Sequence, residues 1–165
     1  MPRFILVALL ASTLAPAALA SDAPDEKEPF FSVANDEDIG PYIVGPNGRA
    51  VYMFDTQTRG GDGLPPLESC GPRCREAWPP LVVAPVTTKN LSVSDGLDPN
   101  LAGSVTDGDK LVASYNGHPL FYFNREGESE GPSGHGIHTH GGWWIALAPN
   151  GNAIRTGTIP SETDY

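Results

Sequence analysis

An aromatic hairpin pattern occurs twice in the 165-residue chain and restricts its fold more than any other feature. Asn47-Gly48 is followed by the sequence RAVYMFD, and Asn116-Gly117, 69 positions later, is followed by HPLFYFN. Asn-Gly favours the type I′ turn that joins two antiparallel strands. Because side chains alternate along a strand, each copy places two aromatic rings on one face. These rings are Tyr52 and Phe54 in the first copy, and Phe121 and Phe123 in the second.

Each copy continues through a polar, glycine-rich loop to a tryptophan and a third apolar strand. The first copy reaches Trp78 and a strand at 81–85, and the second reaches Trp143-Trp144 and a strand at 145–149, an offset of 64 residues. One copy has too few strands to be stable alone, whereas two copies that pack their aromatic faces together would form one core. The sequence therefore predicts an all-β fold, a compact antiparallel sandwich or partly open barrel of two pseudo-symmetric repeats.

The other segments are arranged around this two-repeat domain, which we place at residues 40–150. Residues 1–20 have the basic start, short apolar run and small-residue end of a secretory signal peptide. Residues 21–39 form an acidic segment that we expect to be flexible. Repeat one covers about 40–85, a spacer covers 86–108, and repeat two covers about 109–149. Residues 151–165 are expected to form a polar C-terminal tail.

The charge and the apolar segments limit the partners of the exported chain. Ten basic and twenty acidic residues give the chain a net charge of −10, which repels nucleic-acid phosphates and anionic lipids. Beyond the signal peptide, no segment approaches the ~20 apolar residues of a membrane span. No lipid-anchor cysteine follows the expected cleavage after Ala20. We therefore expect a soluble protein of the periplasm or the medium, with no nucleic-acid partner and no membrane span.

Five short sequences follow one another in a distinctive order within residues 40–150. They are RAVYMF, CGPRC, WPPL, YNGHPLFYF and GGWW. In this order the chain resembles a bacterial family of secreted repeats and predicted lipoproteins, described by a Tyr-x-aromatic-x-x-Asp motif. The chain departs from that motif, because Gln57 takes the acidic position in the first copy, and in the second Glu126 takes it while Phe121 replaces the tyrosine. The resemblance implies the fold and an envelope location, and it implies no activity.

The only two cysteines of the chain, Cys70 and Cys74, are separated by three residues. In an oxidising compartment such a close pair predicts a disulfide. A thiol–disulfide catalyst usually has two residues between its cysteines, at the start of a helix. The spacing therefore favours a structural bridge, and a redox role of the pair stays as an alternative.

Three of the four histidines lie within six positions of the second loop, at His135, His138 and His140. In an extended segment His138 and His140 point the same way and could bind one ion. Neutral imidazoles suit copper, zinc or nickel, so we take these residues as candidate ligands of a transition metal, copper or zinc first. The alternative is a hydrogen-bonded, glycine-rich loop that carries histidines and binds no cofactor.

No catalytic constellation emerges from the sequence, since Ser133 lacks the strand–turn–helix context of an activated serine. Only one of Trp143 and Trp144 can face the core from a strand, so the pair offers a candidate contact for an envelope protein partner. The sequence thus predicts an exported, non-enzymatic binding or interaction module of the cell envelope, with metal binding as its sharpest form. The alternatives are a periplasmic redox or electron-transfer accessory protein and a purely structural envelope protein.

Overall fold

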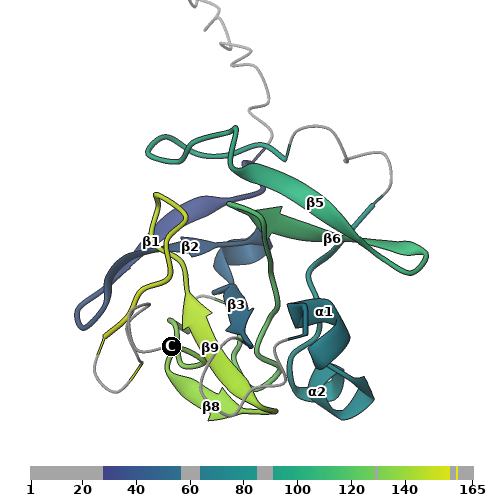
Figure 1. Cartoon of the computed structure of the whole chain (residues 1–165). Helices are drawn as coiled ribbons and strands as arrows, with labels where there is room; N and C mark the ends of the chain where they lie inside the picture. The colour runs from purple at the N-terminus through teal and green to yellow at the C-terminus, as the bar shows by residue number, and fades with distance from the viewer. Residues whose placement is uncertain (1–27, 57–63, 85–90, 129, 157–158, 160–165) are drawn as a thin grey trace, which may run out of the picture.

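The computed structural model describes residues 28–56, 64–84, 91–128, 130–156 and 159, which form mainly antiparallel strands (Figure 1). The strands are β1 (Ser32–Asp36), β2 (Gly40–Val44), β3 (Tyr52–Asp55), β4 (Val82–Val83), β5 (Ala102–Asp107), β6 (Lys110–Tyr115), β7 (His118–Pro119), β8 (Ile137–Thr139) and β9 (Gly142–Ala146). The helices are the 3-10 turn η1 (Pro46–Gly48), α1 (Pro66–Ser69) and α2 (Pro72–Ala77).

Three small antiparallel sheets make up the fold. Their strand orders are β1–β2, β3–β9–β8 and β4–β6–β5, and β7 pairs with β6. Figure 1 shows the long β5–β6 pair across the top of the molecule, β3–β9–β8 below it, and the two short α-helices at the lower right. The predicted all-β fold is confirmed as a sandwich of small sheets, and the described strands do not close into a barrel.

Both Asn-Gly pairs form tight turns. The φ angles are 61° and 67° at Asn47-Gly48, and 49° and 78° at Asn116-Gly117. Two successive positive φ angles are what a type I′ turn requires, and asparagine and glycine adopt them at the lowest cost. A second backbone bond closes the first turn, because the N–H of Gly45 donates to the carbonyl of Arg49 at 2.8 Å.

The two aromatic hairpins meet at residues that the sequence repeat makes equivalent. The N–H of Tyr52 donates to the carbonyl of Phe121 at 2.9 Å, and the N–H of Phe121 donates to the carbonyl of Tyr52 at 2.9 Å. An antiparallel pair that exchanges both bonds has local two-fold symmetry. Around it, β9 of the second predicted unit pairs with β3 of the first, and β4 of the first pairs with β6 of the second. The two units are thus interleaved.

Apolar residues are buried on both faces of β3. On one face Tyr52 and Phe54 belong to an aromatic cluster. On the other, Val51 and Met53 belong to a mainly aliphatic cluster, called the aliphatic cluster below, which also contains Phe31 and Tyr115. The sequence predicts a single core between two aromatic faces, and the aliphatic cluster is an addition to it. The aromatic cluster consists of Tyr42, Val44, Ala50, Tyr52, Phe54, Cys70, Cys74, Trp78, Phe121, Trp144 and Ala146.

Four stacked rings form the centre of the aromatic cluster, in the order Phe54, Trp144, Trp78 and Phe123. Successive ring centroids lie 4.1, 4.1 and 4.4 Å apart, with interplanar angles of 7°, 1° and 23°. The outer two rings occupy equivalent hairpin positions. The inner two, Trp78 and Trp144, are 66 residues apart in the sequence. This separation is two residues larger than the offset of 64 that aligns the two predicted third strands.

Two segments predicted to flank or separate the repeats belong to the packed domain. The sequence predicts a flexible segment at 21–39, but it contains β1; residues 1–27, with the predicted signal peptide, lie outside the described part of the chain. The predicted spacer, 86–108, contains β5 and the buried side chains of Leu91 and Leu97. Each of the two strands holds one large apolar residue, Val33 in β1 and Val105 in β5, so neither shows a two-residue apolar period in the sequence.

The predicted C-terminal tail and the first loop also differ from expectation. Ile159 is buried, and Arg155 forms an ion pair of 2.8 Å with the buried Asp55. In the first loop, α1 and α2 each begin with a proline, Pro66 and Pro72, at a position that suits its fixed φ angle. Both helices are too short to produce a helical period in the sequence.

The stack predicts unequal costs for removing the two neighbouring tryptophans of β9. We expect Trp144→Ala to lower the free energy of unfolding by about 3–5 kcal/mol, because its fully buried ring lies between two others. Trp143→Ala is the matched control, since its ring is half-buried on the opposite face, and its loss should be clearly smaller. Urea unfolding followed by circular dichroism measures both, and equal losses would contradict the central role of the stack.

Candidate functional site

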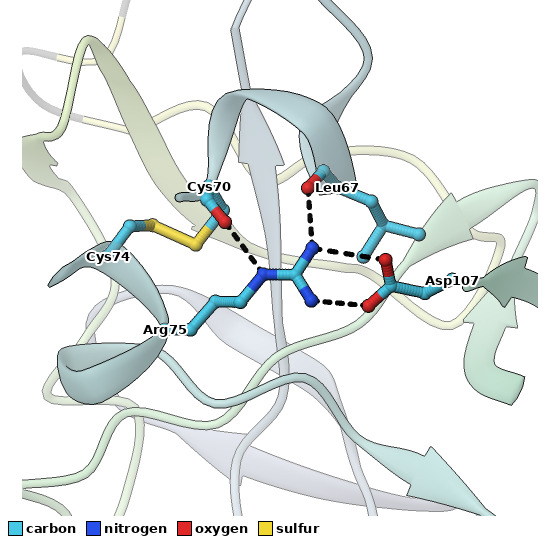
Figure 2. A network of polar contacts seen from close by, with 5 residues as sticks. All are labelled: Leu67, Cys70, Cys74, Arg75 and Asp107. Atoms are coloured by element: carbon cyan, nitrogen blue, oxygen red, sulfur yellow. Dashed lines mark hydrogen bonds and ion pairs between the residues drawn. A yellow bond between two sulfur atoms is a disulfide. The ribbon is translucent and has the colours of Figure 1, made fainter. Parts of the chain in front are cut away.

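Cys70 and Cys74 form the predicted disulfide, and one arginine fixes the loop that contains it. Arg75 donates from Nε to the carbonyl of Cys70 at 2.7 Å and from Nη2 to the carbonyl of Leu67 at 2.7 Å (Figure 2). Its guanidinium also forms an ion pair with Asp107 of β5. Both cysteines are buried, which hinders the attack of an external thiolate that disulfide exchange requires. This geometry favours a structural bridge over a redox-active one.

His135, the first of the three candidate metal ligands, uses both ring nitrogens within the protein. Its Nδ1 accepts the N–H of Ala146 at 3.2 Å, and its Nε2 lies 3.1 Å from the hydroxyl of Thr156. An Nδ1 that accepts a hydrogen bond places the ring proton on Nε2. Burial lowers the pKa of His135, which favours this neutral form. His135 therefore supports the second loop and offers no open nitrogen.

The other two candidate ligands lie on the β8–β9 hairpin. His138 is exposed on β8, and its ring centroid lies 4.8 Å from that of Trp143. His140 is exposed in the turn, where its φ angle is 56°. Over the described residues, no three His, Cys, Asp or Glu side chains lie close enough together to hold a metal ion. Binding of copper or zinc through the three histidines stays a prediction.

A buried carboxylate connects the two predicted units. The hydroxyl of Tyr52 lies 2.8 Å from both oxygens of Glu126, and the hydroxyl of Ser133 donates to Oε1 at 2.9 Å. Glu126 is only 4% exposed, and the N–H of Gly134 donates to the Tyr52 hydroxyl at 3.1 Å. Burial first, and then the bond to Glu126, raise the pKa of Tyr52 far above its usual value of 10. The phenol therefore stays protonated and donates.

This hydrogen-bonded pair joins the first predicted unit to the second. Tyr52 is the motif tyrosine of the first copy, whereas Glu126 holds the acidic position of the second. The other two positions of the pattern hold Phe121, which has no hydroxyl, and Gln57, which lies outside the described residues. The carboxylate has a structural role, because it fixes the second loop to β3.

A pocket of about 250 Å³ opens beside Phe123, the last ring of the stack. It is lined by Ala77, Trp78, Phe123, Arg125, Ile137, Thr139 and His140. Two of these residues are stacked rings, and two, Arg125 and His140, are exposed. At the other end of the stack Phe54 is only 1% exposed. The stack is therefore closed at one end and accessible at the other.

Arg125 gives this pocket a positive charge in an otherwise acidic protein. Within the described part of the chain, its guanidinium has no carboxylate or carbonyl partner. An arginine fork binds carboxylates through two parallel hydrogen bonds, and His140 adds a ring nitrogen at the same mouth. The volume lies just below the ~300 Å³ typical of the smallest ligand sites. The pocket thus suits one ring that carries an anionic group.

The two tryptophans predicted as candidate contacts lie on opposite faces of β9. Trp144 is fully buried, as the prediction that only one of the pair faces inward requires. Trp143 is half-buried against the aliphatic cluster and does not line the pocket beside Phe123. The sequence assigns Trp78 and Phe123 to the core, and no signal in it distinguishes the accessible end of the stack from the closed end.

Comparisons with known proteins give no match. No family model matches the chain, and neither a curated protein nor a solved structure matches it. Among the described residues, no helix is both long enough and apolar enough to cross a membrane. The function therefore has to be inferred from the residues themselves.

The bond between Tyr52 and Glu126 predicts a specific cost for removing one oxygen atom. We expect Tyr52→Phe to lower the free energy of unfolding by about 1–3 kcal/mol, because a buried carboxylate loses a donor. Tyr122→Phe is the matched control: the Tyr122 hydroxyl has no hydrogen-bond partner among the described residues, so its loss should change stability by less than about 0.5 kcal/mol. Urea unfolding of both variants tests this, and similar losses would argue against the structural role of the pair.

Proposed function

We propose that this protein is an exported, non-enzymatic binding module of the cell envelope, and that it binds a small anionic aromatic group in the pocket beside Phe123. One observation carries the proposal: two stacked rings line the same small cavity as Arg125, which has no ion-pair partner among the described residues. A bound ring gains from aromatic contact about 0.5–1.5 kcal/mol beyond the area that it buries. The arginine then selects ligands, or side chains of a partner, that carry a carboxylate.

The proposal of binding without catalysis rests on the groups that line the pocket. General acid–base catalysis needs a titratable group positioned at the reacting atom, often with a second group that orients it. Among the lining residues His140 carries the one imidazole ring, and no hydrogen bond from another described residue orients it. The carboxylate–phenol pair of Glu126 and Tyr52 does not line the pocket, and it is buried in hydrogen bonds that hold the second loop against β3.

Export to the envelope is the second part of the proposal. Its support is the sequence of residues 1–20 and the resemblance to secreted repeats and predicted lipoproteins. The disulfide adds to this, because such bonds persist in oxidising compartments and are rare in the cytosol. We infer membership of that family from the ordered motifs, and the Tyr52–Glu126 bond supplies a physical reason for its tyrosine and acidic positions.

The proposed pocket predicts selective binding of an aromatic anion. We expect indole-3-acetate to bind the mature protein and to shift the resonances of Trp78 and Phe123 in NMR titrations, while neutral indole binds more weakly. Arg125→Gln should reduce the affinity for indole-3-acetate about tenfold, because a hydrogen bond to a charged group is lost. Ala77→Leu should fill the cavity and abolish binding of both probes.

Two controls make this titration decisive. Arg73→Gln removes the same charge from an exposed position of α2 that does not line the pocket, and it should leave the affinity unchanged. Thermal unfolding checks that each variant keeps its fold. Binding that is equally strong in Arg125→Gln and Arg73→Gln, or absent from the parent protein at millimolar probe, would refute the proposed function.

A further inference from the structure

The outer edge of β1 presents backbone groups that point away from the domain. The register places Val33 opposite Ile43 and Asn35 opposite Pro41. Pro41 has no N–H, and the N–H of Ile43 donates to the carbonyl of Leu147 at 3.0 Å, on the side away from β1. Both are therefore non-hydrogen-bonded pairs of the ladder, in which the N–H and C=O of Val33 and Asn35 point outward.

The same edge already pairs with an extended segment at its beginning. The N–H of Phe31 donates to the carbonyl of Ser92 at 3.0 Å, and its carbonyl accepts the N–H of Ser94 at 2.9 Å, so Phe31 forms a parallel bridge with Val93. After Ser94 the chain enters a turn at Asp95-Gly96. Among the described residues no strand continues beside β1, and Val33 is 37% exposed. With respect to the described part of the chain, the edge is therefore open beyond Phe31 and suited to strand pairing.

A groove of about 450 Å³ lies next to this open edge. Its lining includes all of β1, Tyr42 and Val44 of β2, and the first Asn-Gly turn. The charged residues of the lining are Glu28 and Asp36, and no lysine or arginine is among them. A second copy of this chain, with a net charge of −10, would be repelled, whereas a basic segment would be attracted.

We propose that the β1 edge and its groove bind an extended segment of another protein that carries lysine or arginine at alternate positions. In strand addition, backbone hydrogen bonds supply affinity and every second side chain enters a pocket of the host. The four open groups of Val33 and Asn35 pair with the backbone of the segment. Its basic side chains face the groove, where Asp36 and Glu28 complement their charge. No residue of this surface lines the pocket beside Phe123.

The probe is a hexapeptide of alternating lysine and valine with blocked ends, compared with its glutamate–valine counterpart. We expect the basic peptide to bind the mature protein, to slow hydrogen exchange at the amides of Val33 and Asn35, and to lose affinity with rising salt. Asn35→Pro should weaken binding about tenfold or more, because proline removes an outward N–H that an edge strand can lose without unfolding. Asn35→Ala is the matched control and should bind like the parent.

Two further variants separate the backbone from the charge. Asp36→Asn keeps the oxygen that accepts the N–H groups of Asp38 and Ile39 in the turn, removes the charge, and should weaken the basic peptide selectively. Ala77→Leu, which fills the other pocket, should leave this binding unchanged, so the two proposals fail separately. Equal affinity for the acidic peptide, equal binding by Asn35→Pro and Asn35→Ala, self-association through β1 in sedimentation, or absence of binding would each overturn the proposal.

Discussion

The stack of Phe54, Trp144, Trp78 and Phe123 is the contact on which the rest of the domain depends. Its rings come from both hairpins and from the segments that begin both third strands, so all four must be in place before the stack is complete. Dispersion between large flat rings is short-ranged and needs close approach. The exchange of backbone bonds between Tyr52 and Phe121 sets the two hairpins at the spacing that the stack requires.

The two halves of this arrangement differ where the proposed function is concentrated. Phe54 is sealed at one end of the stack, whereas Phe123 at the other borders a pocket that Arg125 also lines. In the same way, Tyr52 donates to a buried carboxylate, and its equivalent, Phe121, has no hydroxyl to donate. At both places the two predicted units differ, and the difference leaves the accessible Phe123 ring and the Tyr52 hydroxyl without a counterpart in the other unit.

The sequence predicts the parts of this protein that repeat a local pattern. The Asn-Gly turns, the aromatic faces and the disulfide all depend on neighbours within a few residues, and the structure contains them. β5 is not predicted, because Val105 is its one large apolar residue. The pocket could not be predicted, since its lining comes from separate segments of the chain. The histidine cluster shows that nearness in sequence can also mislead. His138 and His140 lie on one hairpin, but the ring of His135 is hydrogen-bonded to the backbone of Ala146.

The interleaving of the two units has a consequence for how the chain acquires its fold. Tyr52 pairs with Phe121, 69 positions away, and β3 pairs with β9, which is more distant still in the sequence. Such non-local contacts slow folding, because a long loop must close before any of them forms. Neither half of the chain can complete a core alone, because its strands pair with strands of the other half. If the protein is exported as proposed, the half that is synthesised first therefore has no stable fold that a translocation channel would have to unfold. Late closure of the core would then keep the chain extended for passage across a membrane in the unfolded state.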